Sequence, residues 1–325
     1  MITGAILLVG GMGSRLMPLT KATPKPMLSV AGVPFTEHQI RKAADAGISE
    51  IVLATSYKAE LFEPYFGDGG KFGIKIKYAV EKTALGTGGG IKNASSLLDN
   101  CDEVVIFNGD VLSGHSLENQ LDFHRKNKAE VTLYLTEVKD ARAYGCVELS
   151  ADKKVESFNE KMENPKSNLI NAGCYVFNPK VIEQIAADKV VSIERDTFPA
   201  LLASGTKVVG YVDNSYWLDI GTPAALVKAS SDLILGKISS SATPTHSGDC
   251  LIFDSATIGS GSEINNGSVI ESEVVVESNC QINGSIVGKG AKIGSNCQIS
   301  DSIIAPGAQI QAGMVILNNY VIYYI

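Results

Sequence analysis

The C-terminal quarter of the chain repeats an aliphatic residue at nearly constant spacing. These residues stand six apart from Ile252 to Ile282, and intervals of five before Val287 and Ile304 interrupt a series that otherwise continues at six to Ile322. A six-residue period is typical of a parallel β-helix, in which each hexapeptide forms one face of a prism-shaped coil and its aliphatic side chain points inward. Because one coil takes three hexapeptides, we predict about four coils.

The N-terminal part of the chain instead alternates short apolar runs with amphipathic stretches. This alternation is typical of strands joined through helices into a mostly parallel sheet. Residues 35–47 have helical apolar spacing and end on a glycine suited to a C-cap. The predicted strands are residues 5–9, 50–55, 74–80, 103–110, 130–138, 171–178 and 208–213. We therefore predict an α/β domain at 1–238, a joint at 239–250 and a β-helix domain at 251–325.

Charge and composition exclude several classes of protein. The chain has 28 Lys and Arg against 35 Asp and Glu, a net charge of -7, and no basic run, so we do not expect it to bind nucleic acid. No stretch approaches the ~20 apolar residues of a membrane helix, so no membrane partner is expected. The six cysteines show no CxxC spacing and no signal peptide is evident, which favours a reducing cytoplasm.

A glycine-rich segment, GGMGSRLMPLT at 10–20, follows the first predicted strand. Glycines at a strand end let backbone N–H groups approach an oxyanion closely, which suits a phosphate. The segment is not a dinucleotide fingerprint, because Leu16 stands where the third glycine belongs, and the Gly-Lys-Ser/Thr of a Walker A loop is absent. An ordinary turn with solvated charges remains the alternative.

Four charged residues extend this interpretation. Arg15 offers a planar fork to phosphate oxygens and Lys25, held between two prolines, offers a point charge, so together they could neutralise a polyphosphate. Asp110 ends an apolar strand, where ligands bind in open α/β sheets, and Asp219 lies beside the only tryptophan. Two carboxylates that converge on a triphosphate would suit Mg²⁺, whereas a cap or turn is the alternative role for each aspartate alone.

These motifs and their order resemble the sugar nucleotidyltransferase family. The resemblance is carried by GGMGSRLMPLT with PKP at 24–26, LGTGG at 85–89, NGD at 108–110, EK at 160–161, NAG at 171–173 and WLDIGT at 217–222. It spans residues 3 to about 235, and the hexapeptide tail resembles the left-handed β-helix that many members carry. It implies a Rossmann-like catalytic domain with a mostly parallel mixed sheet, and transfer of a nucleotidyl group from an NTP to a sugar 1-phosphate.

The resemblance also implies a role for each site residue. Arg15, Lys25 and Lys161 would be the catalytic residues that hold phosphates, and Asp110 and Asp219 would bind Mg²⁺. Sugar hydroxyls would meet Gly145, Glu160 and Asn171. The nucleotide would meet Gly10, Gly11, Gly13, Ser14, Glu81, Gly86 and Thr87. Two departures are modest, since Met162 follows EK where many members have proline, and Ser14 replaces the commoner threonine.

Several alternatives remain open from the sequence. LGTGGGI, SIERDTFPALL and YWLDIGTP look most like members that use GTP and mannose 1-phosphate, but UTP or dTTP with glucose 1-phosphate would need only a few different hydrogen bonds. A non-catalytic subunit that senses a sugar nucleotide is a second alternative. An acyltransferase in the tail is a third, although no histidine follows His246. The apolar ending VIYYI at 321–325 favours a homo-oligomer that forms through the β-helix.

Overall fold

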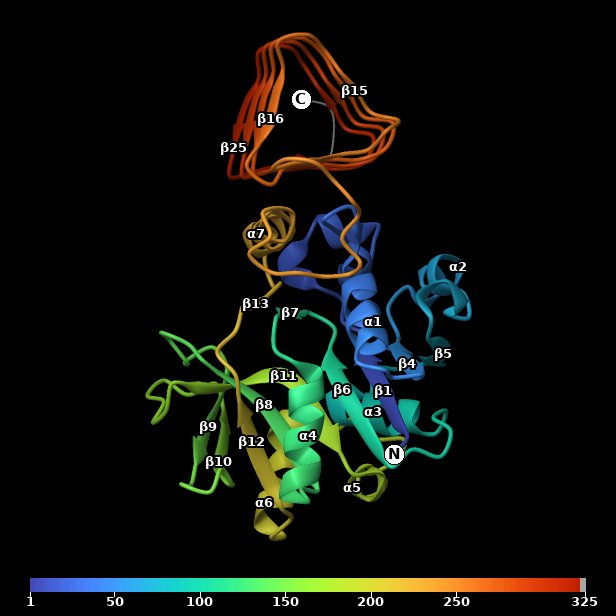
Figure 1. The fold of residues 1–325 in the computed structure, drawn as a ribbon, viewed down its shortest axis with the longest axis vertical. Coiled ribbons are helices and arrows are strands. Elements are labelled where there is room, and N and C mark those ends of the chain that lie inside the picture. Colours follow the sequence, from blue (N-terminus) through green and yellow to red (C-terminus); the bar gives the residue numbers. More distant parts are fainter. Residues whose placement is uncertain (322–325) are drawn as a thin grey trace. The chain divides into compact units, whose positions relative to one another are not determined.

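The computed structural model describes residues 1–321, and the chain forms two compact units (Figure 1). One unit combines Met1–Gly11 with Gln39–Trp217, and the other combines Met12–His38 with the chain from Leu218 onward. Short segments of the N-terminal region are therefore divided between the units, and each unit is described by itself.

The first unit is built on a nine-stranded mixed sheet. Its main path runs in the order β10-β9-β11-β6-β1-β4-β5, and β8 joins β11 to β12. β5, β4, β1 and β6 are mutually parallel, whereas β11 is antiparallel to β6 and to β8. The strands are β1 (Thr3–Leu8), β4 (Glu50–Thr55), β5 (Lys75–Val80), β6 (Glu103–Asn108), β8 (Val131–Glu137), β9 (Gly145–Leu149), β10 (Val155–Glu160), β11 (Leu169–Phe177) and β12 (Val208–Val212).

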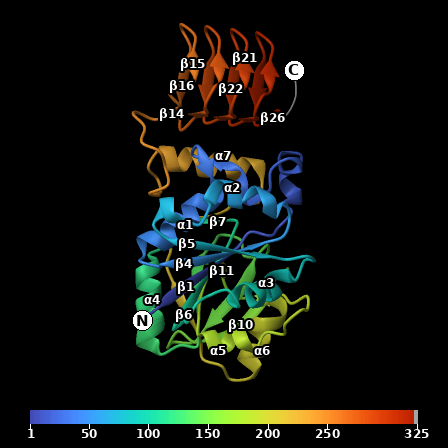
Figure 2. The same cartoon turned by 90° about the vertical axis from the view of Figure 1, so that its right-hand side faces the viewer.

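Helices cover both faces of this sheet. Figures 1 and 2 show α4 (Leu117–Asn127) on one face and α3 (Gly86–Ser95) on the other. Ser116 caps α4 by accepting a hydrogen bond from the backbone N–H of Asn119. The remaining helices along the chain are α1 (Phe35–Asp45), α2 (Glu63–Phe66), α5 (Pro179–Glu183), α6 (Phe198–Ala203) and α7 (Pro223–Ile234). None of the helices formed by the described residues is long and apolar enough to cross a membrane.

The sequence predictions for this region are confirmed in type and place. Each predicted strand and the predicted helix is present, with its ends within two residues of the expected position. The hairpin of β9 and β10 was not predicted, because its second strand, VESFNE, mixes buried and exposed positions without clean alternation. The short strands β2 (Ser29–Val30), β3 (Val33–Pro34), β7 (Val111–Ser113) and β13 (Trp217–Asp219) were also too brief to show a period.

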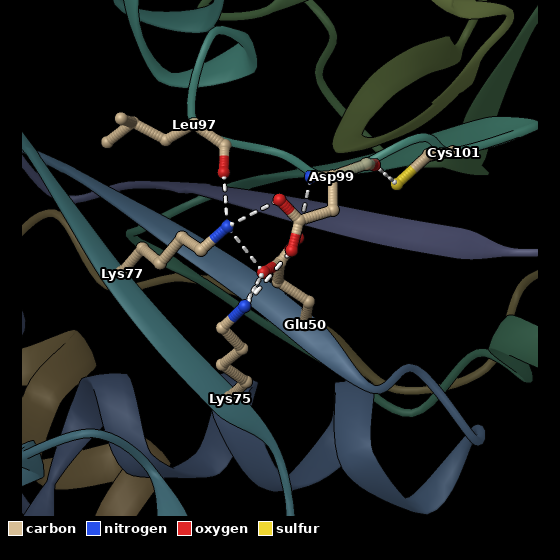
Figure 3. Close-up of polar contacts among 6 residues, drawn as sticks. All are labelled: Glu50, Lys75, Lys77, Leu97, Asp99 and Cys101. Atoms are coloured by element: carbon tan, nitrogen blue, oxygen red, sulfur yellow. Dashed lines mark hydrogen bonds and ion pairs between the residues drawn. The ribbon is translucent and has the colours of Figure 1, made fainter.

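An ion network closes the end of the sheet where β4 and β5 begin (Figure 3). The buried Glu50 carboxylate lies 2.7 Å from Lys77 Nζ and 3.1 Å from Lys75 Nζ, and both lysines also pair with Asp99. The backbone N–H of Asp99 donates to Glu50, and Lys77 donates to the Leu97 carbonyl. The network therefore fastens the loop after α3 to the strand starts, opposite the strand ends where ligands bind.

The second unit contains a parallel β-helix made of three strand ladders, seen end-on in Figure 1. Aliphatic side chains stack from coil to coil, as in the aligned set Ile264, Ile282, Ile299 and Ile316. The predicted inward positions from Ile264 to Ile316 are all buried, and the architecture fits the expected left-handed β-helix. The strands are β14 (Leu251–Ile252), β15 (Thr257–Ile258), β16 (Glu263–Asn265), β17 (Val269–Ile270), β18 (Val275–Val276), β19 (Gln281–Asn283), β20 (Ile286–Val287), β21 (Lys292–Ile293), β22 (Gln298–Ser300), β23 (Ile303–Ile304), β24 (Gln309–Ile310), β25 (Val315–Leu317) and β26 (Tyr320–Val321).

The predicted series keeps its register at the first position, where Ile252 pairs with Ile270, and departs from the structure at the last. Ile252 is 39% exposed, because the first coil has a neighbouring coil on one side only. At the other end Val321 pairs with Ile304 and is buried. The interval from Ile316 to Val321 is therefore five residues, and Val321 takes the inward position that was predicted for Ile322. Ile322 itself, and most of the apolar ending VIYYI, lie outside the described residues.

Candidate functional site

The glycine-rich segment places Lys25 beside Gly13 in the second unit. Gly13 has a left-handed backbone conformation with φ of 62°, and a Cβ there would lie only 2.7 Å from Lys25 Cβ. Thr20 donates from Oγ1 to the Gly13 carbonyl at 3.0 Å, and Ser14 opens a short 3-10 turn that ends at Leu16. Glycine is therefore required at position 13 for both conformation and space.

Arg15 reaches the segment that carries Asp219. Its Nη2 atom lies 4.0 Å from Asp219 Oδ2, and its guanidinium lies so close to Gly221 that a Cβ at 221 would be 2.8 Å from Nη2. The Arg15 side chain is 67% exposed, whereas the Asp219 side chain is mostly buried. Two motifs about 200 residues apart therefore meet within one unit, with the exposed guanidinium able to contact a ligand.

The first two glycines of the segment, at the end of β1 in the first unit, differ in their packing. Ser56 donates from Oγ to the Gly10 carbonyl at 2.6 Å, and a Cβ at Gly10 would lie 2.7 Å from that Oγ. At Gly11, by contrast, none of the described atoms lies within 4 Å of the Cβ position. Gly10 is thus needed for packing, whereas Gly11 leaves open space beside the backbone.

The glycines of LGTGGG allow α3 to approach the backbone of residues 189–191. Cβ atoms at Gly86 and Gly89 would lie 2.6 Å from the carbonyl oxygens of Val191 and Lys189. The N–H of Gly88 donates to the Val191 carbonyl at 2.8 Å. This close packing accounts for glycines in a helix that propensity alone disfavours.

Glu81 lies at the start of α3. Its Oε2 accepts a hydrogen bond from the Leu85 N–H at 3.1 Å, and its Oε1 is so near Gly90 that a Cβ there would lie 2.7 Å away. Burial raises the pKa of the Glu81 carboxyl, and the bond from Leu85 opposes that rise. The carboxylate therefore supports the helix N-terminus, in addition to the base contact predicted for it.

Thr87 is joined to a segment that the sequence analysis did not assign to the site. Its Oγ1 donates to Glu194 Oε2 at 2.8 Å and accepts from the Ile193 N–H at 2.8 Å, and Ser192 Oγ also donates to Glu194 Oε2 at 2.9 Å. Glu194 is therefore a polar residue near the candidate site that sequence reasoning missed. The signal in the sequence is SIERDTF at 192–198, in which a serine and a glutamate stand two residues apart.

The predicted sugar residues Gly145 and Glu160 lie opposite each other on the paired strands β9 and β10. A Cβ at Gly145 would lie 2.9 Å from Glu160 Oε2, and Lys161 Nζ lies 3.7 Å from Glu160 Oε1. Burial raises the pKa of the Glu160 carboxyl, and the negative charge of Glu194 adds to the rise. A half-buried carboxylate of this kind is stabilised by hydrogen-bond donors such as ligand hydroxyls.

Asn171 lies where the pairing of β11 with β8 shifts register, which re-aims its side chain. Its Nδ2 donates to Tyr175 Oη at 2.8 Å and its Oδ1 accepts from the Gly173 N–H at 3.1 Å. A Cβ at Gly173 would lie 3.1 Å from Asn108 Cβ, so this bulge lies beside the segment that leads to Asp110.

The structure thus gathers the predicted residues in two sets. Gly13, Ser14, Arg15, Lys25 and Asp219 belong to the second unit. The first unit holds Gly10, Gly11, Glu81, Gly86, Thr87, Asp110, Gly145, Glu160, Lys161 and Asn171. Within residues 1–321 no three His, Cys, Asp or Glu side chains form a metal-binding cluster, and a site of two carboxylates completed by phosphate oxygens would not need one.

An α/β sheet with this glycine-rich segment, followed by a β-helix, is the arrangement expected of a nucleotidyltransferase. Residues 4–235 match the Nucleotidyl transferase family, so the chain belongs to that family. Residues 246–323 match the family described as GMPPB C-terminal domain.

The similarity to individual proteins agrees with this assignment. The chain is 50% identical to a mannose-1-phosphate guanylyltransferase from Mycobacterium tuberculosis over 82% of this chain and 74% of that protein. It is 35% identical to the mannose-1-phosphate guanylyltransferase catalytic subunit beta of Drosophila pseudoobscura pseudoobscura, over 81% and 72% of the two chains. The crystal structure of HddC from Yersinia pseudotuberculosis superposes with a TM-score of 0.60 at 30% identity, over 71% of this chain and 98% of HddC.

Proposed function

We propose that this chain is a sugar-1-phosphate nucleotidyltransferase that makes GDP-mannose and pyrophosphate from GTP and mannose 1-phosphate. The observation that carries the proposal is the placement of Arg15 against Gly221 and beside Asp219, which joins the glycine-rich segment to WLDIGT. The 50% identical relative named mannose-1-phosphate guanylyltransferase supports the choice of substrates.

In the proposed reaction an oxygen of the sugar phosphate attacks the α-phosphorus of GTP in line with the bond that breaks. A new P–O bond forms, the bond between the α-phosphorus and its bridging oxygen breaks, and pyrophosphate leaves with that electron pair. The nucleophile is already ionised, so no general base is required, and catalysis rests on positioning and charge neutralisation. Arg15 and Lys25 hold the phosphates of GTP, and Lys161 holds the sugar phosphate.

Neutral and acidic groups orient the substrates. Gly10, Gly11, Gly13 and Ser14 present the backbone of the glycine-rich segment to the nucleotide, and Glu81, Gly86 and Thr87 lie toward its base and ribose. Gly145, Glu160 and Asn171 contact sugar hydroxyls. Burial raises the pKa of the Glu160 carboxyl, and hydrogen bonds donated by these hydroxyls would stabilise its charged form.

The chemistry of the two aspartates fits Mg²⁺, a hard cation that takes carboxylate oxygens together with phosphate oxygens and water. Asp110 and Asp219 would hold the ion through their carboxylate oxygens. Both residues are partly buried; Asp110 follows β6, and Asp219 ends β13. When bound, the ion supplies positive charge to the triphosphate as pyrophosphate leaves.

We also propose the domain limits, assembly and location of the protein. In this proposal the catalytic domain covers 1–238, after the end of α7 at Ile234, the joint covers 239–250, and the β-helix covers 251–325, from the start of β14 at Leu251. The β-helix mediates a homo-oligomer. Cytoplasmic location is supported by the six cysteines, all free thiols in the structure.

The test is release of pyrophosphate by the purified protein with Mg²⁺, with GTP, UTP, dTTP, ATP and CTP each crossed against mannose 1-phosphate and glucose 1-phosphate. We expect GTP with mannose 1-phosphate to give the highest kcat/KM. If UTP or dTTP with glucose 1-phosphate dominates, the reaction class stands and the substrates are wrong. If no pair reacts while GDP-mannose still binds, the sensor alternative replaces the enzyme.

A further inference from the structure

The turn that carries Asp110 is held tightly against β1. Asn108 ends β6, Val111 begins β7, and the N–H of Gly109 between them donates to the Leu8 carbonyl at 3.0 Å. A Cβ at position 109 would lie 2.1 Å from that carbonyl oxygen, so only glycine fits there. The backbone on the N-terminal side of Asp110 is therefore fixed by the sheet itself.

One side chain of α1 bridges the two sides of the same turn. Gln39 is buried, and its Nε2 donates to the Asn108 carbonyl at 2.7 Å and to the Val111 carbonyl at 3.2 Å. The two carbonyls flank Gly109 and Asp110, so a single amide group spans the residue that would bind metal. The Oε1 atom of Gln39 is buried without a hydrogen-bond partner among the described residues. The side chain therefore acts on this turn only as a hydrogen-bond donor, through Nε2.

A second α1 side chain, one turn further on, holds the next part of the segment. Lys42 Nζ donates to the Ser113 carbonyl at 2.7 Å and approaches His115 Nδ1 at 3.1 Å. Because residues at i and i+3 share a helix face, Gln39 and Lys42 present donors to residues 108–113 from one side. His115 in turn contacts Gln120, and its ring stacks on Tyr134 with 3.9 Å between the ring centroids. These contacts anchor His115, and with it the contact to Lys42, in the core.

We propose that Gln39, assisted by Lys42, is a positioning residue for the metal-binding carboxylate of Asp110. The proposal rests on the proposed function of Asp110. Outer contacts that orient a metal ligand commonly change metal affinity about 10- to 100-fold when removed. Loss of the Gln39 donors removes the hydrogen bonds that tie the Asn108 and Val111 carbonyls to α1 and frees the turn, so the carboxylate no longer has one fixed direction.

The test compares Mn²⁺ binding, by electron paramagnetic resonance on the full-length protein with the metal alone, across Asp110→Asn, Gln39→Met, Lys42→Met and Gln120→Met. Gln120→Met is the matched control, because Gln120 is a fully buried glutamine that does not contact the Asn108 or Val111 carbonyl: its amide donates to the Cys174 carbonyl, and it reaches Lys42 only through His115. We expect Asp110→Asn to weaken binding most, Gln39→Met by about 10-fold, Lys42→Met by a smaller factor, and Gln120→Met, whose only link is through His115, by the least.

Kinetics separate positioning from general damage. Gln39→Met should raise the Mg²⁺ activation constant while leaving the KM for mannose 1-phosphate unchanged, and Gln120→Met should lower stability without that split. If Asp110→Asn weakens Mn²⁺ binding but Gln39→Met does not, the inference is overturned and the metal site stands. If Asp110→Asn has no effect, both are overturned. If Gln39→Met does not fold, unchanged Mn²⁺ binding by a folded Lys42→Met overturns the inference.

Discussion

The hydroxyl of Thr87 donates a hydrogen bond to the carboxylate of Glu194, with the two oxygens 2.8 Å apart. The same hydroxyl accepts from the buried Ile193 N–H, so it joins the first turn of α3 to a segment more than 100 residues further along the chain. Thr87 was predicted to contact nucleotide, and that role stays a prediction. Its contacts give it a structural role as well.

Replacement of Thr87 by valine tests that structural role. Thr87→Val keeps the shape of the side chain but removes both hydrogen bonds and leaves the Ile193 N–H buried without its partner. We expect a loss of about 2 kcal/mol in the free energy of unfolding, measured by urea denaturation. Thr87→Ser retains the hydroxyl and should lose much less. Equal stability of Thr87→Val and the parent protein would contradict the structural role.

The Thr87 contact illustrates what sequence reasoning can and cannot reach. The types of residue in the candidate site were predictable, because glycines, cations and carboxylates at strand ends have recognisable chemistry. The partner of Thr87 was not, because a hydrogen bond between segments so far apart depends on packing that leaves no local pattern. The same holds for Glu81, whose bond to the Leu85 N–H follows from the exact start of α3.

The β-helix was predictable for the opposite reason. Its coils have one repeated cross-section, so the inward positions recur along the sequence, and those from Ile264 to Ile316 are all buried. Ile252 keeps this register, since it pairs with the buried Ile270, and it is exposed because it has a coil on one side only. The prediction was wrong only at the last position. The interval before Val321 shortens to five residues, and the sequence did not reveal this because the next residue, Ile322, is also aliphatic.

Arg15 gives the most direct test of the proposed catalysis. Arg15→Ala should lower kcat/KM for GTP with mannose 1-phosphate about 100- to 1000-fold, because a preorganised charged donor is lost where charge develops. Gly221→Ala is a second probe that keeps the charge but displaces the guanidinium, since the new Cβ would lie 2.8 Å from Nη2. We expect an intermediate loss. Near-normal turnover in a folded Arg15→Ala protein would refute the role.

His38 should make the protein sensitive to acid. The ring is buried, its Nε2 lies 3.0 Å from the Val30 carbonyl and its Nδ1 lies 2.7 Å from Ser240 Oγ. Burial lowers the pKa of His38 from 6.5 to about 4, although the bond to Val30 opposes the shift. Between these two values the unfolded chain binds a proton that the folded protein does not, so stability falls as pH falls from 6.5 to 4.

The size of this effect can be measured by difference. The shift corresponds to about 3 kcal/mol across that interval. His38→Gln has no group that titrates there, so its free energy of unfolding should depend less steeply on pH than that of the parent protein. Urea denaturation of both proteins at several pH values provides the comparison. Parallel pH dependences would show that His38 titrates normally.

The last coil of the β-helix should contain the contact of the proposed homo-oligomer. Along one face the outward positions are polar in β19 and β22, where Gln298 and Ser300 align with Val315 and Leu317 of β25. The side chains of Val315 and Leu317 are 58% and 57% exposed. Exposure of apolar side chains to water is unfavourable, and a second copy of the chain would cover them. The double change Val315→Gln and Leu317→Ser copies β22 onto β25, so it should preserve the coil while lowering the mass measured by light scattering after size-exclusion chromatography.

Glu263→Ala, at the same register in the first coil, is the control and should leave the mass unchanged. An unchanged oligomer in the double variant, or a monomeric parent protein, would place the contact elsewhere or remove it.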